Sequence, residues 1–353
     1  MGKKLLAFAL CAVMVLGLAA CGSSSSSTSS STSDSTSSDE PYKIGMVTDT
    51  GGVNDGSFNQ SSWEGLSQLG EDYADVIEVN YLESATDSDY SANIETFLDE
   101  DYDLIIGVGY MLADAIGEAA DANPDVLFAI IDDSTNADKD NVACLMFEQS
   151  QASYLVGYVA GLMTESNVVG FVLGMSTTTM NEFGYGYVAG VLDANPDATV
   201  LQANANSFGD SATGKSLANA QITNGADVIF HAAGGTGLGV IEACKEANIY
   251  AIGVDSDQSS YAPENVITSA MKRVDTASYE IGLEAYEGNF TSGVHTYDLS
   301  SEGVDIAPTT DLLPDDVLTT VEELKEQIIA GDIVVPKTQE EFEASYGDAY
   351  ELD

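Results

Sequence analysis

The sequence predicts an α/β protein of two lobes, each built on a parallel sheet flanked by helices. Three observations lead there. Short apolar runs rich in Val and Ile recur from residue 42 onwards, and longer stretches with helical spacing separate most of them. Short strands that alternate with helices are typical of parallel sheets covered on both faces. The runs are too many for one compact sheet of this kind, so we expect two lobes.

The expected elements follow in chain order. The strands are residues 42–47, 75–82, 103–109, 126–132, 142–147, 168–174, 198–204, 226–232, 249–255 and 266–271. The helices include 59–69, 113–120, 154–164, 186–194, 212–222, 239–247 and an amphipathic 314–330 that ends before a Gly. A helix that begins at residue 149 and a new series of strands after it indicate a lobe boundary. We expect lobe 1 to span 42–148 with a return of roughly 270–295, and lobe 2 to span 149–269 with parts of 296–353.

The charge balance excludes whole classes of partner. Among 353 residues, 10 are Lys or Arg and 58 are Asp or Glu, which gives a net charge of −48. A nucleic-acid backbone or a polybasic membrane contact requires a basic face, so neither is expected. The acidic residues are spread along the chain, as on a solvated surface that aids solubility. We expect a monomer. With 44% hydrophobic residues, the chain is not disordered as a whole.

The amino terminus has the pattern of an export signal. Lys3 and Lys4 precede an uncharged apolar run over residues 5–20, which is short for a membrane-spanning helix of about 20 residues. The run ends in Leu-Ala-Ala-Cys-Gly, which resembles the bacterial lipobox. We therefore expect residues 1–20 to be a lipoprotein signal peptide and Cys21 to carry the lipid that anchors the protein outside the cytoplasm.

Residues 21–41 are expected to be the lipidated Cys followed by a flexible tether, because Ser and Thr dominate and nothing apolar is present to bury. A Ser-rich tail without an anchor is the alternative, but it leaves Cys21 unexplained. Cys144 and Cys244 remain in the body, both within apolar patterns. Two buried free thiols are expected, with one disulfide as the alternative. No Cys/His cluster suggests a metal, and no cofactor is expected.

The segment after the first expected strand has the features of a binding loop. Ligands of parallel sheets bind beyond the carboxyl ends of the strands. Asp49 leaves the strand towards such an end, and paired glycines follow that allow a close backbone approach. Ser57 or Asn59 is a candidate cap for the following helix, and Phe58 is an aromatic residue at its start. The alternative is an ordinary strand, turn and helix with a core Phe.

The stretch DTGGVNDGSFNQSSWEGL, residues 49–66, resembles the opening signature of the basic membrane protein family. Members of that family are nucleoside-binding lipoproteins that feed ABC transporters. Further matching segments are residues 131–133, 225–246 and 251–258, and the resemblance runs from about 43 to about 335. It implies a type I periplasmic-binding-protein-like fold, a nucleoside in the cleft between the lobes, closure about a hinge and delivery to a permease. It implies no catalytic residue.

The resemblance also implies the base contacts. Phe58 is expected to stack on a purine, Asp49 to lie near the base, and Asp133 to accept hydrogen bonds from it. A carboxylate there favours bases that offer an N–H, such as guanine or hypoxanthine. A second stacking aromatic is expected from the other lobe. Phe208, just past a strand end, is favoured over Phe183 and Phe230.

The ribose contacts follow from the same resemblance. Asp255 is expected to accept from the ribose hydroxyls and Lys272 to contact the ribose, while Gly234 and Gly235 bring the backbone close. Thr50 and Asn59 are further candidate contacts. The chemistry is independently suitable: a base stacks on an aromatic face with about 1–3 kcal/mol, and a carboxylate can bind a diol through two strong hydrogen bonds.

Several alternatives stand beside this interpretation. Asp132 and Asp133 could be solvated turn residues, and the acidic segment 132–140 lacks the Gly and Glu of an EF-hand calcium loop. The glycines of 233–239 imitate a dinucleotide fingerprint, but Val240 stands where a third small residue is needed. No nucleophile elbow or zinc motif occurs. An exported nucleoside-processing enzyme, or a sugar-binding or sensor lipoprotein of the same fold, remains the alternative function.

Overall fold

The computed structural model describes residues 40–352. The chain divides into two units, Met1–Asp39 and Glu40–Asp353. The expected signal peptide, the lipidation at Cys21 and nearly all of the tether lie outside the described residues, so they stay predictions. Everything below concerns the second unit.

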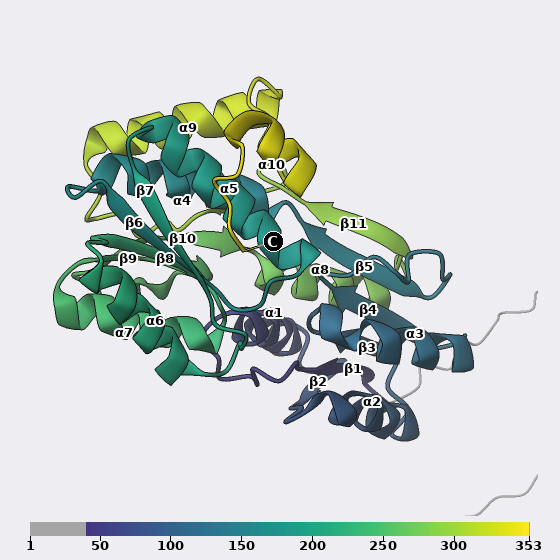
Figure 1. Ribbon diagram of the computed structural model, residues 1–353. Coiled ribbons are helices and arrows are strands. Elements are labelled where there is room, and N and C mark those ends of the chain that lie inside the picture. Colours follow the sequence, from purple (N-terminus) through teal and green to yellow (C-terminus); the bar gives the residue numbers. More distant parts are fainter. Residues whose placement is uncertain (1–39, 353) are drawn as a thin grey trace, which may run out of the picture. The chain divides into compact units, whose positions relative to one another are not determined.

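The first sheet has six parallel strands in the order β11-β5-β4-β3-β1-β2 (Figure 1). In chain order they are β1 (Tyr42–Val47), β2 (Ile77–Leu82), β3 (Leu104–Gly107), β4 (Leu127–Ile131), β5 (Val142–Phe147) and β11 (Gly293–Tyr297). Its main helices are α1 (Phe58–Asp72), α2 (Tyr90–Asp99), α3 (Ala113–Ala122) and α8 (Val274–Tyr286). Fully buried apolar residues in β3, β4 and β5 make its core. We call this sheet with its helices lobe 1.

The second sheet has the order β12-β10-β9-β8-β6-β7. Its strands are β6 (Val168–Leu173), β7 (Thr199–Asn204), β8 (Val228–Ala232), β9 (Tyr250–Asp255), β10 (Val266–Lys272) and β12 (Val304–Ile306). Its helices are α4 (Gln149–Met163), α5 (Thr178–Ala194), α6 (Ser211–Thr223), α7 (Gly235–Ala247), α9 (Asp315–Ala330) and α10 (Gln339–Tyr346). Figure 1 shows α6 and α7 on one face of the sheet and α4, α5 and α9 on the other. We call this body lobe 2.

The expected fold class of two sheets flanked by helices is confirmed, with one departure at an edge. β12 pairs antiparallel with β10, whereas every other strand pair of the two sheets is parallel. The chain passes between the lobes after β5, after β10 and after β11. Three crossings of the chain therefore join the two lobes.

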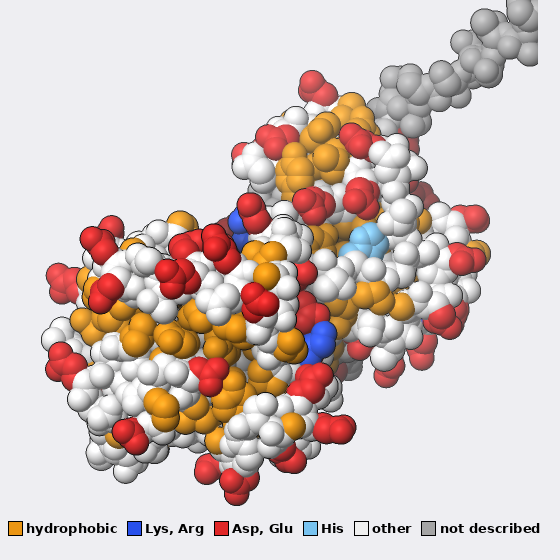
Figure 2. All heavy atoms as spheres, turned by 90° about the horizontal axis from the view of Figure 1, so that it is seen from above, with side chains coloured by type: hydrophobic (Ala, Val, Ile, Leu, Met, Phe, Trp, Pro, Cys, Tyr) orange, Lys and Arg blue, Asp and Glu red, His pale blue; other side chains and the backbone are white. Residues whose placement is uncertain are grey.

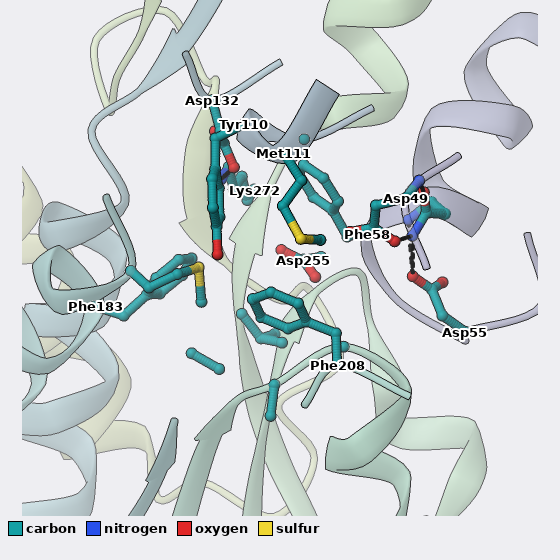
Figure 3. Close-up of a pocket in the computed structure, with 17 residues that line it drawn as sticks. Asp49, Asp55, Phe58, Tyr110, Met111, Asp132, Phe183, Phe208, Asp255 and Lys272 are labelled. Atoms are coloured by element: carbon teal, nitrogen blue, oxygen red, sulfur yellow. Dashed lines mark hydrogen bonds and ion pairs between the residues drawn. The ribbon is translucent and has the colours of Figure 1, made fainter. Parts of the chain in front are cut away.

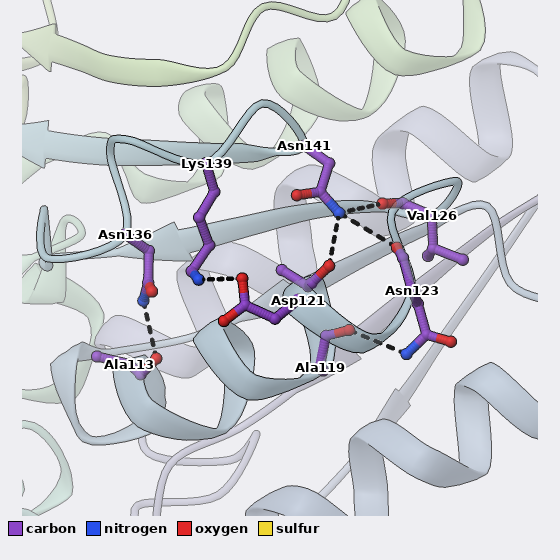
Figure 4. A network of polar contacts seen from close by, with 9 residues as sticks. Ala113, Ala119, Asp121, Asn123, Val126, Asn136, Lys139 and Asn141 are labelled. Carbon is purple, nitrogen blue, oxygen red and sulfur yellow. Dashed lines mark hydrogen bonds and ion pairs between the residues drawn. The ribbon is translucent and has the colours of Figure 1, made fainter.

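The loop between β4 and β5 is fastened to helix α3 by side-chain amides (Figure 4). Asn136 donates to the carbonyl of Ala113 at 2.8 Å, and Asn141 donates to the carbonyls of Ala120, Asn123 and Val126, between the last turn of α3 and the start of β4. Lys139 adds an ion pair with Asp121, with 2.5 Å between Nζ and Oδ1. Because buried backbone carbonyls require donors, these contacts fix the path of the loop. They thereby hold its first residue, Asp132, at the end of β4.

The two body cysteines are free. Cys144 in β5 and Cys244 in α7 are both buried and unpaired, which confirms the expected pair of buried thiols. Within residues 40–352 no helix is both long and apolar enough to cross a bilayer. Figure 2 shows Asp and Glu side chains scattered over the visible face, with few Lys or Arg. That distribution fits a solvated acidic surface.

Candidate functional site

A cavity lies between the lobes, at the carboxyl ends of both sheets (Figure 3). Ligands of parallel sheets bind at this end of the strands. Lobe 1 contributes lining residues from the ends of β1, β3 and β4, and lobe 2 from the ends of β8, β9 and β10 and from α5. The lining residues are Asp49, Asp55, Phe58, Asn59, Gly109, Tyr110, Met111, Asp132, Met180, Phe183, Phe208, Ala232, Ala233, Gly234, Val254, Asp255 and Lys272.

Asp49 is held in place by two donors. Its Oδ1 accepts from the backbone N–H of Gly51 and from Nδ2 of Asn59, both at 2.7 Å. The Asn59 oxygen in turn accepts from the backbone N–H of Asp49. Burial raises the pKa of Asp49 to about 6, although the Gly51 and Asn59 hydrogen bonds oppose the rise. Asn59 therefore fixes the position of Asp49 and also lines the cavity.

Asp55 caps helix α1. Its carboxylate accepts from the backbone N–H groups of Ser57 and Asn59 at 2.9 Å and of Gln60 at 3.1 Å. These groups have no carbonyl partner within a helix, and a carboxylate at this end is stabilised by the helix dipole. The cap was expected from Ser57 or Asn59. Because Asp55 caps the helix instead, the Ser57 hydroxyl is available for a contact with the other lobe.

That contact joins Ser57 to Asp255. The Ser57 hydroxyl donates to Oδ2 of Asp255, which lies at the end of β9 in lobe 2. Asp255 has left-handed backbone with φ of 64°, so its side chain leaves the strand in a direction that a regular extended residue does not offer. Burial raises the pKa of Asp255 to about 7, and the nearby Lys272 and the Ser57 hydroxyl oppose the rise.

Lys272 and Asp132 form a second contact across the lobes. Nζ of Lys272 lies 2.5 Å from Oδ2 of Asp132, and the two side chains are only 2% and 5% exposed. The other carboxylate oxygen, Oδ1 of Asp132, is buried without a hydrogen-bond partner. A buried acceptor left unsatisfied is costly, so this oxygen is ready to accept from a ligand donor in the cavity.

Three aromatic rings surround the Lys272 ammonium. The ring centroids of Phe58, Phe147 and Phe183 lie 5.1, 5.1 and 5.4 Å from Nζ, within the range of a cation–π interaction. Figure 3 shows Phe58, Phe183 and Phe208 around the same space. Both lobes therefore present aromatic faces to one cavity.

Most of the residues expected from the sequence meet at this cavity. They are Asp49, Phe58, Asn59, Phe183, Phe208, Gly234, Asp255 and Lys272. Gly235 begins α7 beside the lining, where a Cβ would lie 3.3 Å from the carbonyl oxygen of Phe208 and 3.6 Å from Cα of Asp55. Thr50 is exposed in the loop after β1. These last two contribute no lining surface.

Two other expectations need correction. Asp133 turns away from the cavity, because its carboxylate accepts from the backbone N–H of Thr135 at 2.8 Å; its neighbour Asp132 lines the cavity instead. Phe230 is fully buried in the core of lobe 2, where its ring packs against Phe171 at 5.4 Å and Tyr187 at 5.0 Å between centroids.

Sequence reasoning missed several lining residues. Tyr110 and Met111 follow β3, and Met180 lies in the first turn of α5. The signal for the first two was present: they directly follow an expected strand, where ligand contacts of parallel sheets are found. Asp55 lay within the quoted signature but was not assigned a role. Within the described part of the chain, no group of three or more His, Cys, Asp or Glu could hold a metal ion.

Comparison with known proteins identifies the family. The family model Bmp, described as "ABC transporter substrate-binding protein PnrA-like", matches residues 42–339. The chain belongs to this family. The CD4+ T-cell-stimulating antigen of Listeria monocytogenes is 42% identical over 96% of this chain and 99% of its own. The ABC transporter nucleoside-binding protein BmpA of Lactococcus lactis is 36% identical over 83% of this chain and 89% of its own.

Solved structures agree with this assignment. A solute-binding protein of an ABC transporter from Aeropyrum pernix superposes with a TM-score of 0.79 and 26% identity, over 88% of this chain and 99% of that one. This chain therefore has the two-lobe fold of type I periplasmic binding proteins. It is an ABC transporter substrate-binding protein, and proteins of this family work outside the cytoplasm. The relatives named above by activity are binding proteins, not enzymes.

Proposed function

We propose that this Bmp protein captures a purine nucleoside between its lobes and delivers it to an ABC transporter permease. The observation that carries the proposal is the pairing of aromatic and acidic groups at one cavity. Phe58 of lobe 1 and Phe208 of lobe 2 line it together with the buried carboxylates of Asp132 and Asp255. A nucleoside is a flat base joined to a diol, so it offers one partner for each kind of group. The nucleoside-binding relative BmpA supports the same ligand class.

The base is proposed to stack between the aromatic faces, with about 1–3 kcal/mol for each stacked base. The unpartnered Oδ1 of Asp132 then accepts an N–H from the edge of the base. Asp132 thus takes the part that the sequence assigned to Asp133. Guanine and hypoxanthine have such an N–H, which makes guanosine and inosine the preferred ligands.

The ribose is proposed to lie against Asp255 and Lys272. The carboxylate of Asp255 can accept from both ribose hydroxyls once the ligand displaces the Ser57 hydroxyl, and charge-assisted bonds of this kind are strong. A phosphate would be repelled, because four buried carboxylates line the cavity and its single cation, Lys272, is paired with Asp132. Nucleosides are therefore favoured over nucleotides.

Capture is proposed to occur by hinge closure of the lobes, and the closed form is the one that the permease recognises. In this proposal Cys21 carries the lipid that keeps the protein at the membrane, residues 22–41 act as a tether, and the protein works as a monomer without a cofactor.

Calorimetric titration of the unit Glu40–Asp353, refolded to remove any carried ligand, tests the proposal. The ligands are inosine, guanosine, adenosine, cytidine and ribose, and chromatography after each titration detects released base. The variant Asp132→Asn tests the contact with the base. Asp133→Asn is the matched control, because Asp133 lies outside the cavity. We expect inosine or guanosine to bind most tightly, about 10–100-fold weaker binding in Asp132→Asn, and unchanged binding in Asp133→Asn.

Other outcomes point to the alternatives. Release of free base would indicate a nucleoside-processing enzyme. Heat with ribose but with no nucleoside would indicate a sugar-binding protein of the same fold. Equal losses in the two Asp variants would contradict the proposed role of Asp132.

A further inference from the structure

A glycine of lobe 1 is inserted into a socket of lobe 2. Gly56, in the turn before α1, has φ of 65° and is buried. A Cβ at this position would lie 2.5 Å from Oη of Tyr261 and 3.2 Å from Cδ2 of Leu238. Leu238, Gln258 and Tyr261, all of lobe 2, form what we call the Gly56 socket. Only glycine combines this backbone conformation with so close an approach.

The base of the socket is the side-chain amide of Gln258. This side chain is fully buried, and its nitrogen donates to the backbone carbonyl of Gly56 at 2.9 Å. The amide oxygen stays within lobe 2, where it accepts from the backbone N–H of Val254 at 3.0 Å and lies 3.0 Å from Nε2 of His231. One end of the amide is thus fixed in lobe 2 and the other end reaches lobe 1.

The backbone N–H of Val254, which can only donate, determines which way the amide points, and the tautomer of His231 follows from it. The histidine is fully buried, and burial lowers its pKa to about 4, so the ring is neutral near neutral pH. The Gln258 oxygen only accepts, so the hydrogen of the ring must be on Nε2. With its oxygen committed to His231 and Val254, Gln258 can present only its N–H group to Gly56. The donor is therefore oriented before the lobes meet.

We propose that Gln258 is a positioning residue that latches the lobes by binding the Gly56 carbonyl in the closed form. The turn that it holds carries Asp55, which caps α1, and leads directly into Phe58 of the cavity. The latch therefore fixes a lobe 1 aromatic relative to the lobe 2 half of the site. Because the contact is made by protein groups alone, it stabilises the closed form whether or not a ligand is bound.

Hydrogen exchange of the full-length, ligand-free protein tests the latch directly. Gln258→Glu keeps an oxygen for Val254 and His231 but removes the donor to Gly56. Ser269→Ala is the matched control, because Ser269 accepts from the Gln258 backbone N–H within lobe 2. We expect exchange in residues 51–60 to be about tenfold faster in Gln258→Glu, which corresponds to about 1.4 kcal/mol. Ser269→Ala is expected to leave this segment unchanged.

A second measurement concerns ligand release. Only the choice of inosine as the probe rests on the proposed function. Dissociation of inosine is expected to be about tenfold faster in Gln258→Glu than in the unaltered protein. If the unaltered protein binds no nucleoside, the proposed function fails while the exchange measurement still decides the latch. Unchanged exchange in residues 51–60 of Gln258→Glu, or an equal increase in Ser269→Ala, would overturn the latch.

Discussion

Lys272 and Asp132 form an ion pair that connects the two lobes inside the cavity, with 2.5 Å between Nζ and Oδ2. Lys272 belongs to β10 and Asp132 follows β4, so neither lobe contains the complete pair. Both groups are nearly excluded from solvent. A buried charge is tolerated when it is paired, and each residue therefore depends on closure of the lobes to satisfy the other.

The first prediction concerns removal of this lysine. Lys272→Met leaves the Asp132 carboxylate buried without its cation, and breaking such a pair costs about 3–5 kcal/mol. We expect the free energy of unfolding, measured by urea denaturation, to fall by this amount. Lys139→Met is the control, because Lys139 pairs with the exposed Asp121 and surface pairs contribute about 0–1 kcal/mol. Adding Asp132→Asn to Lys272→Met should recover much of the loss; no recovery would show that the pair itself is not the cause.

The second prediction concerns pH. Burial raises the folded-state pKa of Asp255 from 3.8 to about 7. Between these two values the folded protein retains a proton that the unfolded chain has released. The contribution of Asp255 to the free energy of unfolding therefore has its full value below about pH 4 and is lost as the pH rises to about 7. Asp49, whose pKa burial raises to about 6, acts in the same direction.

Asp255→Asn tests this sign. The amide can still accept from Ser57 but carries no charge to desolvate. At pH 8 the variant is expected to be more stable than the unaltered protein, by up to about 4 kcal/mol. The difference should shrink as the pH falls and vanish near pH 4. Urea denaturation between pH 4 and 8 measures it, and a variant that is less stable at pH 8 would refute the assignment.

The third prediction separates two phenylalanines. Phe208 is half-buried at the cavity, whereas Phe230 is fully buried among the rings of lobe 2. Phe230→Ala should lower the free energy of unfolding by about 3–5 kcal/mol. Phe208→Ala should lower it far less but weaken inosine binding by about 1–3 kcal/mol through lost stacking. Urea denaturation measures the stability of both variants, and calorimetry measures their affinity for inosine. If Phe208→Ala lost mainly stability and Phe230→Ala lost mainly affinity, the assignment of the two residues would be wrong.

The sequence predicted the fold class well because the central strands carry long apolar runs. β3, β4 and β5 are almost entirely buried, so their composition alone marks them. The edge strand β11 alternates between half-buried and exposed residues, and β12 has only three residues. Such edges lack the pattern that identifies an interior strand, and the antiparallel direction of β12 had no sequence signal.

The candidate site was predictable in position but not in detail. Eight of the twelve residues expected from the sequence line the cavity. The choice between adjacent carboxylates depends on backbone conformation: Asp132 has φ of 67°, which directs it into the cavity while Asp133 turns towards Thr135. The choice between Phe208 and Phe230 posed the same problem. The two side chains have the same chemistry, and the sequence does not show which of them faces the cavity and which faces the core of the lobe.

The fourth prediction concerns the carboxyl-terminal segment. Tyr350 packs on helix α5, its hydroxyl donates to Oδ1 of Asn181 at 2.9 Å, and a Cβ at Gly184 would lie 2.2 Å from its ring. The same helix carries Met180 and Phe183 into the cavity. Displacing Tyr350 should therefore loosen one wall of the site as well as the fold.

Gly184→Ala introduces this displacement with one methyl group. We expect the free energy of unfolding to fall by about 1–3 kcal/mol, the usual cost of overpacking, and inosine binding to weaken because α5, the helix that carries Phe183, must shift. Tyr350→Phe removes only the hydroxyl and should cost about 1 kcal/mol with little change in binding. Gly288→Ala is the control for a glycine substitution without a clash, since nothing lies within 4 Å of its Cβ position; its positive φ allows a modest stability cost but no effect on binding. If Gly184→Ala lowered stability and left inosine affinity unchanged, the segment would support the fold without shaping the cavity.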